Sequence, residues 1–152
     1  MTDSAGPGAI SDDLSWRWHD NLIYGLKFNI GDPEKQEWHS DLIFDIDHIV
    51  EWLCEPSGAC RFLVAPATLV FHEAGDLSLA VDHGGGLTEW AISHVTCERL
   101  DRPFDYWRWT IGLSMPPGGL ITFCSSGFTQ TLRSEPTLSL EQRVPRAERR
   151  NT

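Results

Sequence analysis

The chain has 152 residues, the usual size of one domain and long enough to bury a substantial core. Hydrophobic residues make up 41% and charged residues 22%, which excludes general disorder. The formal net charge of −10 disfavours DNA or RNA as a partner, because phosphate binding needs clustered Lys and Arg.

The first fifteen residues are predicted to form a flexible N-terminal arm, because Gly6, Pro7 and Gly8 lie among Ser and Asp. This segment lacks the basic and apolar regions of a signal peptide. No stretch of the chain approaches the length of a membrane span. We therefore expect a cytoplasmic protein without membrane association.

Alternation of apolar and polar residues predicts a series of short strands from Leu22 onward. Pro66 confines its strand to a sheet edge or marks a bend. The segment Ile49–Leu53 is compatible with a short helix or a strand. Turn residues, such as those at 116–119, separate the runs. The predicted strands lie at residues 22–30, 38–47, 61–65, 68–71, 77–81, 90–95, 106–113 and 120–124.

About eight strands and at most one short helix, near Ile49–Cys54, predict an all-β domain over residues 16–138. The expected architecture is an antiparallel β-sandwich or barrel. Residues 139–152 are polar, rich in Arg and without periodicity, which predicts a solubilising C-terminal tail. Contact of its arginines with an anionic partner, or with the protein's own acidic face, is the alternative.

The four cysteines form no CxxC pair, and without a secretion signal we expect them to be reduced thiols. A Cys54–Cys60 disulfide is the alternative. The segment His83–Gly86 matches an oxyanion-hole string of some lipases, but the chain has no GxSxG nucleophile. We interpret this segment as a hairpin turn.

A divalent-metal site is conceivable around Asp45 and Asp47, which share one face of a strand. His48 and Glu51 follow closely, and His72 is a further candidate ligand for a metal-dependent hydrolase. No established metal-binding spacing is matched, so a solvated strand face is the favoured interpretation. We expect no cofactor.

Two Trp-Arg-Trp segments place indole pairs on one strand face each, at Trp16 and Trp18 and at Trp107 and Trp109. Exposed indoles would form a binding platform, whereas buried ones belong to the core. His19 and Asp20 lie between the first of these segments and the first long strand. They could act as an acid–base pair only if a turn brings them together. A turn stabilised by its own Asp and Asn is the simpler interpretation.

Four further strings resemble an uncharacterised bacterial family of small β-rich proteins, a domain of unknown function, over residues 16–133. The His-Asp pair before an alternating strand also resembles immunity proteins of polymorphic-toxin systems. These resemblances imply a bacterial origin but no activity. The strings are those at residues 18–21, 45–52, 64–72 and 127–130.

The sequence therefore predicts a non-catalytic module that binds a macromolecule, because it shows no nucleophile–base pair, phosphate loop or metal motif. The expected partner is a basic protein, since the first two-thirds of the chain is acidic, or a second copy of the chain. The alternatives are the metal-dependent hydrolase and a β-barrel that binds a small ligand among its aromatic side chains.

Overall fold

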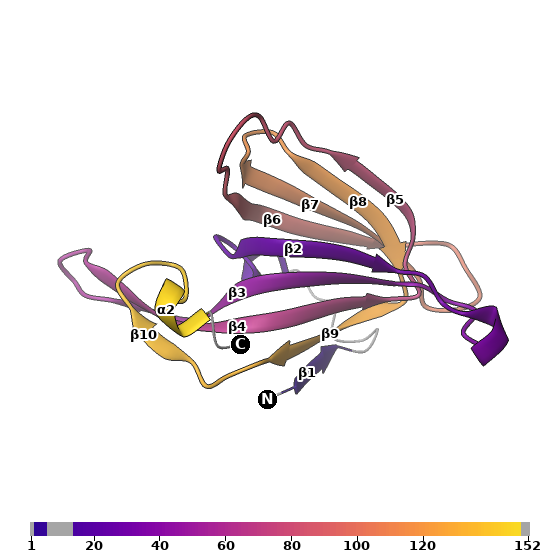
Figure 1. Ribbon diagram of the computed structural model, residues 1–152, viewed down its shortest axis with the longest axis horizontal. Coiled ribbons are helices and arrows are strands. Elements are labelled where there is room, and N and C mark those ends of the chain that lie inside the picture. Colours follow the sequence, from indigo (N-terminus) through magenta and orange to yellow (C-terminus); the bar gives the residue numbers. More distant parts are fainter. Residues whose placement is uncertain (1, 6–13, 150–152) are drawn as a thin grey trace.

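The computed structural model describes residues 2–5 and 14–149, which form ten antiparallel strands, two single-turn helices and a 3-10 turn (Figure 1). The all-β antiparallel prediction is confirmed. The strands are β1 (Thr2–Ala5), β2 (Leu22–Asn29), β3 (Asp41–Cys54), β4 (Cys60–His72), β5 (Gly75–Ala80), β6 (Trp90–Arg99), β7 (Trp107–Met115), β8 (Leu120–Ser125), β9 (Gly127–Leu132) and β10 (Thr137–Ser139). The helical turns are α1 (Leu14–Arg17), η2 (Pro33–Lys35) and α2 (Arg146–Arg149).

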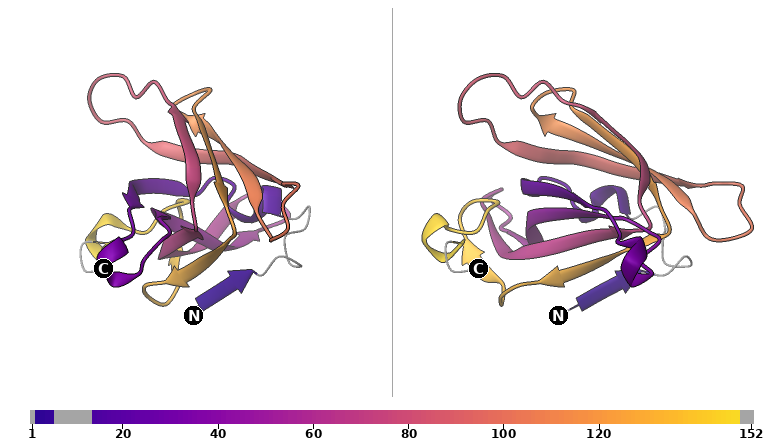
Figure 2. Two further views of the ribbon diagram at one scale, coloured as in Figure 1. Left: turned by 90° about the vertical axis from the view of Figure 1, so that its right-hand side faces the viewer. Right: turned by 45° about the vertical axis from the view of Figure 1, so that its right-hand side comes forward.

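All strands belong to one sheet with the order β1-β9-β4-β3-β2-β6-β7-β8-β5, and β10 pairs with β4 beyond the end of β9. The junction between β2 and β6 consists of only two residue pairs, Leu22 with Ala91 and Ile23 with Trp90. The sheet folds over at this narrow junction. As a result, β5 to β8 form one layer and β2, β3, β4, β9 and β1 form the other, and the layers converge at one end (Figures 1 and 2).

The main core lies between the two layers and is built largely of aromatic rings. The ring of Phe71 makes edge contacts with Trp109 at 4.9 Å and with Phe123 at 4.6 Å between centroids. Trp18 contacts Phe128 at 5.1 Å, and its indole N–H donates a hydrogen bond of 2.7 Å to Gln130 Oε1. The apolar faces predicted from alternation along β3 and β4 point into this core, because successive side chains of a strand point to opposite sides.

A second, smaller core lies on the outer face of β3 and β4. It consists of Ile49, Phe62, Val64 and Val144, each less than a tenth exposed. Val144 comes from the segment after β10, so the C-terminal residues cover this part of the sheet. In Figure 1, α2 accordingly lies beside β3 and β4.

The stretch from Ile49 to Cys54 is a strand and not a helix. It continues β3 and pairs with β4 as far as Cys54, which lies opposite Cys60. The register shifts by one residue between Ile49 and Glu51. This bulge breaks the alternation, which explains why the sequence pattern was ambiguous there.

The two chain ends are more ordered than the sequence predicts. Thr2–Ala5 form β1, which pairs with β9, and Leu14 and Ser15 begin α1, so these parts of the predicted flexible arm have regular structure. Residues 6–13, the rest of that arm, lie outside the described residues. At the other end, the buried Val144 and the ion pairs of Arg143 and Arg149 hold part of residues 139–152, the predicted tail, against the rest of the protein.

The prediction of four reduced cysteines is wrong for one pair. Cys54 and Cys60 form a disulfide that closes the β3–β4 hairpin, while Cys97 and Cys124 are free thiols. The pairing of β3 with β4 places the first two residues directly opposite each other. Within the described ranges, the protein contains no helix long and apolar enough to cross a membrane.

Candidate functional site

The four indoles of the Trp-Arg-Trp segments occupy different environments. Trp18 and Trp109 are fully buried in the main core, and Trp107 is half-buried against it. Trp16 is 72% exposed. The first segment begins in α1 and not in a strand, so Trp16 and Trp18 do not share a face. Only Trp16 is therefore free to form a surface contact.

Trp16 belongs to a row of neighbouring rings that ends at the buried Phe62. We call this row the aromatic cluster: Trp16, His19, Trp52 and Phe62. The centroids of Trp16 and His19 are 4.9 Å apart, those of His19 and Trp52 are 6.4 Å apart in a stacked arrangement, and those of Trp52 and Phe62 are 5.1 Å apart. Trp52 is 44% exposed. Sequence reasoning missed Trp52 and Phe62, because only the register of β3 with β4 places these rings opposite each other.

His19 and Asp20 lie in the turn that follows α1 and are held in one geometry. Asp20 has a left-handed backbone with φ 61°, which brings its carboxylate to 3.5 Å from His19 Nε2. His19 Nδ1 lies 2.6 Å from the Ser93 carbonyl, which can only accept, so Nδ1 carries the proton. The Gln142 amide donates to Asp20 Oδ2 at 2.9 Å. The expected turn is present, but the Asp20 and Asn21 side chains hydrogen-bond to distant residues and, among the described residues, not to the backbone of the turn. The turn fixes the His19 ring at the centre of the aromatic cluster.

Asp45 and Asp47 share the outer face of β3, as predicted, and both form ion pairs with arginines. Arg149 lies 2.7 Å from Asp45 Oδ1 and 3.1 Å from Asp47 Oδ1. Arg133 lies 2.6 Å from Asp45 Oδ1. Asp47 is fully buried, and its Oδ2 accepts a hydrogen bond of 2.9 Å from the Val144 amide. We call Tyr24, Asp45, Asp47, Arg133 and Arg149 the acid–arginine cluster.

Burial dominates the electrostatics of this cluster. It raises the pKa of Asp47, although the Val144 hydrogen bond and the Arg149 charge act in the opposite direction. Burial also raises the pKa of Tyr24 to about 12, and the negative charge of Asp47 adds to this effect. The Arg149 guanidinium lies 3.6 Å above the Tyr24 ring, a cation–π contact that further holds the C-terminal residues on the sheet.

The remaining predicted metal ligands do not converge with Asp45 and Asp47. His48 follows Asp47 on the strand, points to the other side, and accepts a 2.9 Å hydrogen bond at Nδ1 from the Asn21 amide. Burial lowers the pKa of His48 to about 4. Glu51 lies beyond the bulge and is exposed. Over residues 2–5 and 14–149, no group of three His, Cys, Asp or Glu side chains could hold a metal ion.

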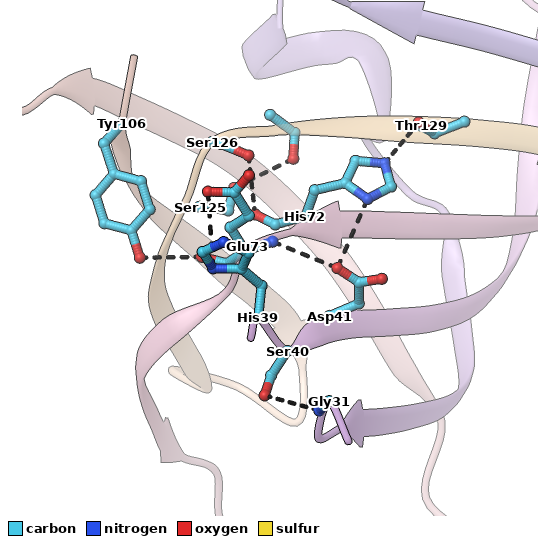
Figure 3. A network of polar contacts seen from close by, with 11 residues as sticks. Gly31, His39, Ser40, Asp41, His72, Glu73, Tyr106, Ser125, Ser126 and Thr129 are labelled. Carbon is cyan, nitrogen blue, oxygen red and sulfur yellow. Dashed lines mark hydrogen bonds and ion pairs between the residues drawn. The ribbon is translucent and has the colours of Figure 1, made fainter. Parts of the chain in front are cut away.

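His72 lies at the other end of the hairpin in a separate polar network (Figure 3). Its Nδ1 is 3.6 Å from Asp41 Oδ1 and its Nε2 is 2.7 Å from Thr129 Oγ1. The Glu73 amide also donates to Asp41 Oδ1, at 3.3 Å. This carboxylate–imidazole–hydroxyl series comes from neighbouring strands β3, β4 and β9. The two His72 contacts each join adjacent strands, so we interpret the network as a cross-strand ladder on the outer face.

Two adjoining cavities lie between residues 140–149, which we call the C-terminal segment, and the β2–β6 junction. One has a volume of about 490 Å³ and the other of about 600 Å³, and both are lined by Leu22, Glu89 and Arg143. The first extends to Tyr24 and Arg149 of the acid–arginine cluster. The second extends to Phe62 of the aromatic cluster and to Asp20. The two cavities therefore connect the two clusters.

No family model, curated protein or solved structure matches this chain. The function must therefore be inferred from its own surface. That surface presents exposed aromatic rings beside a rigid imidazole, carboxylates already paired with arginines, and a recess that joins the two. Such features are suited to binding.

Proposed function

We propose that the protein is a non-catalytic protein-binding module whose contact surface is the aromatic cluster. The observation that carries this proposal is the exposure of Trp16 and Trp52 on either side of His19. Trp is the residue type most enriched among the side chains that dominate interface energies. Hydrogen bonds and packing hold the His19 ring before any partner arrives, so little conformational entropy is lost on binding.

The charge of the surface favours a basic partner. Arg133, Arg143 and Arg149 are occupied by ion pairs with carboxylates of the same chain. Glu51, next to Trp52 in the sequence, forms no ion pair with the described residues and is exposed. The chain as a whole keeps an excess of ten negative charges. Such a surface accelerates association with a positively charged protein.

The resemblance to immunity proteins of polymorphic-toxin systems is consistent with this partner chemistry. A toxin whose active site is basic would offer the complementary charge. This assignment, the bacterial origin and a cytoplasmic location belong to the proposal.

The experiment is site-specific crosslinking of the full chain in its native cells. A photoreactive benzoylphenylalanine replaces Trp52 in one version and Trp38 in a matched control, because Trp38 is 71% exposed and lies outside the aromatic cluster. We expect position 52 to capture one basic protein that position 38 does not. Equal capture at both positions, or capture at position 52 of only a second copy of the chain, would overturn the proposal.

Affinity measurements with the captured protein provide the second arm. Trp16→Ala and Trp52→Ala should each weaken binding by roughly tenfold or more, as expected for interface residues that contribute above 1.4 kcal/mol. Trp38→Ala should leave the affinity unchanged. Similar losses in all three variants would contradict a localised contact surface.

A further inference from the structure

We propose that the outer face of β3 and β4 beneath residues 140–149 is a binding site for an arginine-containing segment of the partner. In the structure, this chain's own residues 140–149, the C-terminal segment, occupy that site as an internal substitute. The inference rests on the proposed function and extends it, because it states the chemistry that the partner presents.

The C-terminal segment shows which side chains the site accepts. Val144 fills the apolar part of the site and packs with Ile49, Phe62 and Val64. Five residues later, Arg149 reaches both Asp45 and Asp47 and lies over the Tyr24 ring. An aliphatic side chain followed at this spacing by a guanidinium is therefore the pattern that the site recognises.

The polar part of the site binds a backbone N–H group as well as an arginine side chain. Asp47 is fully buried, and one of its oxygens accepts the Val144 amide while the other faces Arg149. A buried carboxylate is costly without such partners. The site consequently requires an occupant that supplies both a backbone N–H and a cation, and a basic peptide segment supplies both.

The site is continuous with the aromatic cluster. Phe62 belongs to both, since its ring packs with Val144 on one side and with Trp52 on the other. The cavities along Leu22, Glu89 and Arg143 run between them. A partner segment that starts at Trp52 and follows the sheet thus enters the region that the C-terminal segment covers.

A partner can displace the C-terminal segment because the partner contacts the aromatic cluster in addition to the face of β3 and β4. The C-terminal segment benefits from being tethered to β10, which raises its effective concentration. It leaves Trp16 and Trp52 exposed, however. A partner that engages the aromatic cluster as well as Asp45 and Asp47 gains the contacts that the internal segment lacks.

The test uses a fluorescent synthetic peptide with the sequence of residues 140–149 and the full-length protein in three forms. The wild type should bind it poorly because its own segment occupies the site. The double variant Val144→Ala, Arg149→Ala should bind it at least about tenfold more tightly. Glu148→Ala is the matched control, since Glu148 lies in the same segment, is exposed, and forms no ion pair with any described residue; it should behave as the wild type does.

Peptide chemistry provides the second measurement. Replacing the last Arg of the peptide by Glu should abolish its binding to the double variant, and scrambling the peptide should do the same. Equal binding of the peptide to all three proteins, or equal binding of the Glu peptide, would overturn the inference. Hydrogen exchange of the double variant must also show faster exchange in residues 140–149; unchanged exchange would equally overturn it.

The two proposals can fail separately. In one outcome, the photoreactive group at position 52 captures a basic protein while the peptide experiment fails. In that case the aromatic cluster is supported as a contact surface, and the proposed binding site beneath the C-terminal segment is contradicted. If the peptide experiment succeeds while position 52 captures no other protein, the binding site beneath the C-terminal segment is supported and the proposed function is contradicted.

Discussion

At the residue scale, the two indoles of the first Trp-Arg-Trp segment have opposite environments. Trp16 lies in α1 and faces solvent, whereas Trp18 follows α1, is buried and donates a hydrogen bond to Gln130. Trp109, at the equivalent place of the second tripeptide, is also buried, and it lies on a strand. Trp18 and Trp109 are buried although their local structure differs, so neither residue type nor local structure alone reveals which indole is exposed.

This contrast predicts different stabilities for two variants. Trp18→Phe removes the indole N–H and leaves the buried Gln130 oxygen without its donor, so the free energy of unfolding should fall by about 2 kcal/mol. Trp16→Ala should change it by less than about 0.5 kcal/mol, because the ring is exposed. Urea unfolding curves measure both values. Equal losses in the two variants would contradict the assignment of Trp16 to the surface.

His48 predicts a pH dependence of stability. Its pKa falls from the ordinary 6.5 to about 4 in the folded protein, chiefly through burial, and the charge of Arg17 adds to this effect. Between these two values the unfolded chain binds the proton more readily than the folded one. The stability due to neutral His48 is therefore complete above pH 6.5 and is lost as the pH falls toward 4, by about 3 kcal/mol in all.

Urea midpoints between pH 4 and pH 7 test this assignment. His48→Gln cannot take up the proton, so its stability should depend less on pH than that of the wild type. His39→Gln changes an exposed imidazole and is the matched control. A wild-type profile that stays as steep in His48→Gln would show that another group is responsible.

At the scale of elements, the β3–β4 hairpin carries most of what is distinctive about the protein. It contributes Phe44 and Phe71 to the main core, Asp45 and Asp47 to the acid–arginine cluster, and Trp52 to the aromatic cluster. Alternation predicted its main-core face correctly. The bulge between Ile49 and Glu51 shifts the register by one residue and interrupts the alternation. The sequence pattern therefore did not distinguish a strand from a helix at the end of β3.

The disulfide at the end of this hairpin leads to a prediction about thiol counts. Dithionitrobenzoate should detect two thiols in the denatured chain before reduction, from Cys97 and Cys124, and four after reduction. The double variant Cys54→Ser, Cys60→Ser should lose about 2 kcal/mol of stability, since the bridge restricts a short loop in the unfolded chain. Four reactive thiols in the unreduced denatured protein would contradict the pairing.

At the scale of the whole molecule, one core joins both layers although only two residue pairs connect them through the sheet. Phe71 from one layer contacts Trp109 and Phe123 from the other. Neither layer has a separate aromatic core of this size. The layers should therefore unfold together.

Two spectroscopic signals test this cooperativity. Far-ultraviolet circular dichroism follows the strands, and tryptophan fluorescence follows Trp18 and Trp109 in the core. Their urea transitions should coincide within error, as for a two-state domain. Transitions at clearly different urea concentrations would show that the layers unfold independently.

The sequence alone determined the all-β class, most strands and the faces that point to the main core, because the direction of a side chain follows from its own backbone. Only the tertiary structure decided how those strands pair and what their outer faces meet. Val144 and Asp47 are 97 residues apart in the chain, and Gln142 and Asp20 are 122 apart. The acid–arginine cluster, the aromatic cluster and the disulfide all depend on such pairings. Local patterns carry no record of register between distant segments, so these sites could not be found without the folded chain.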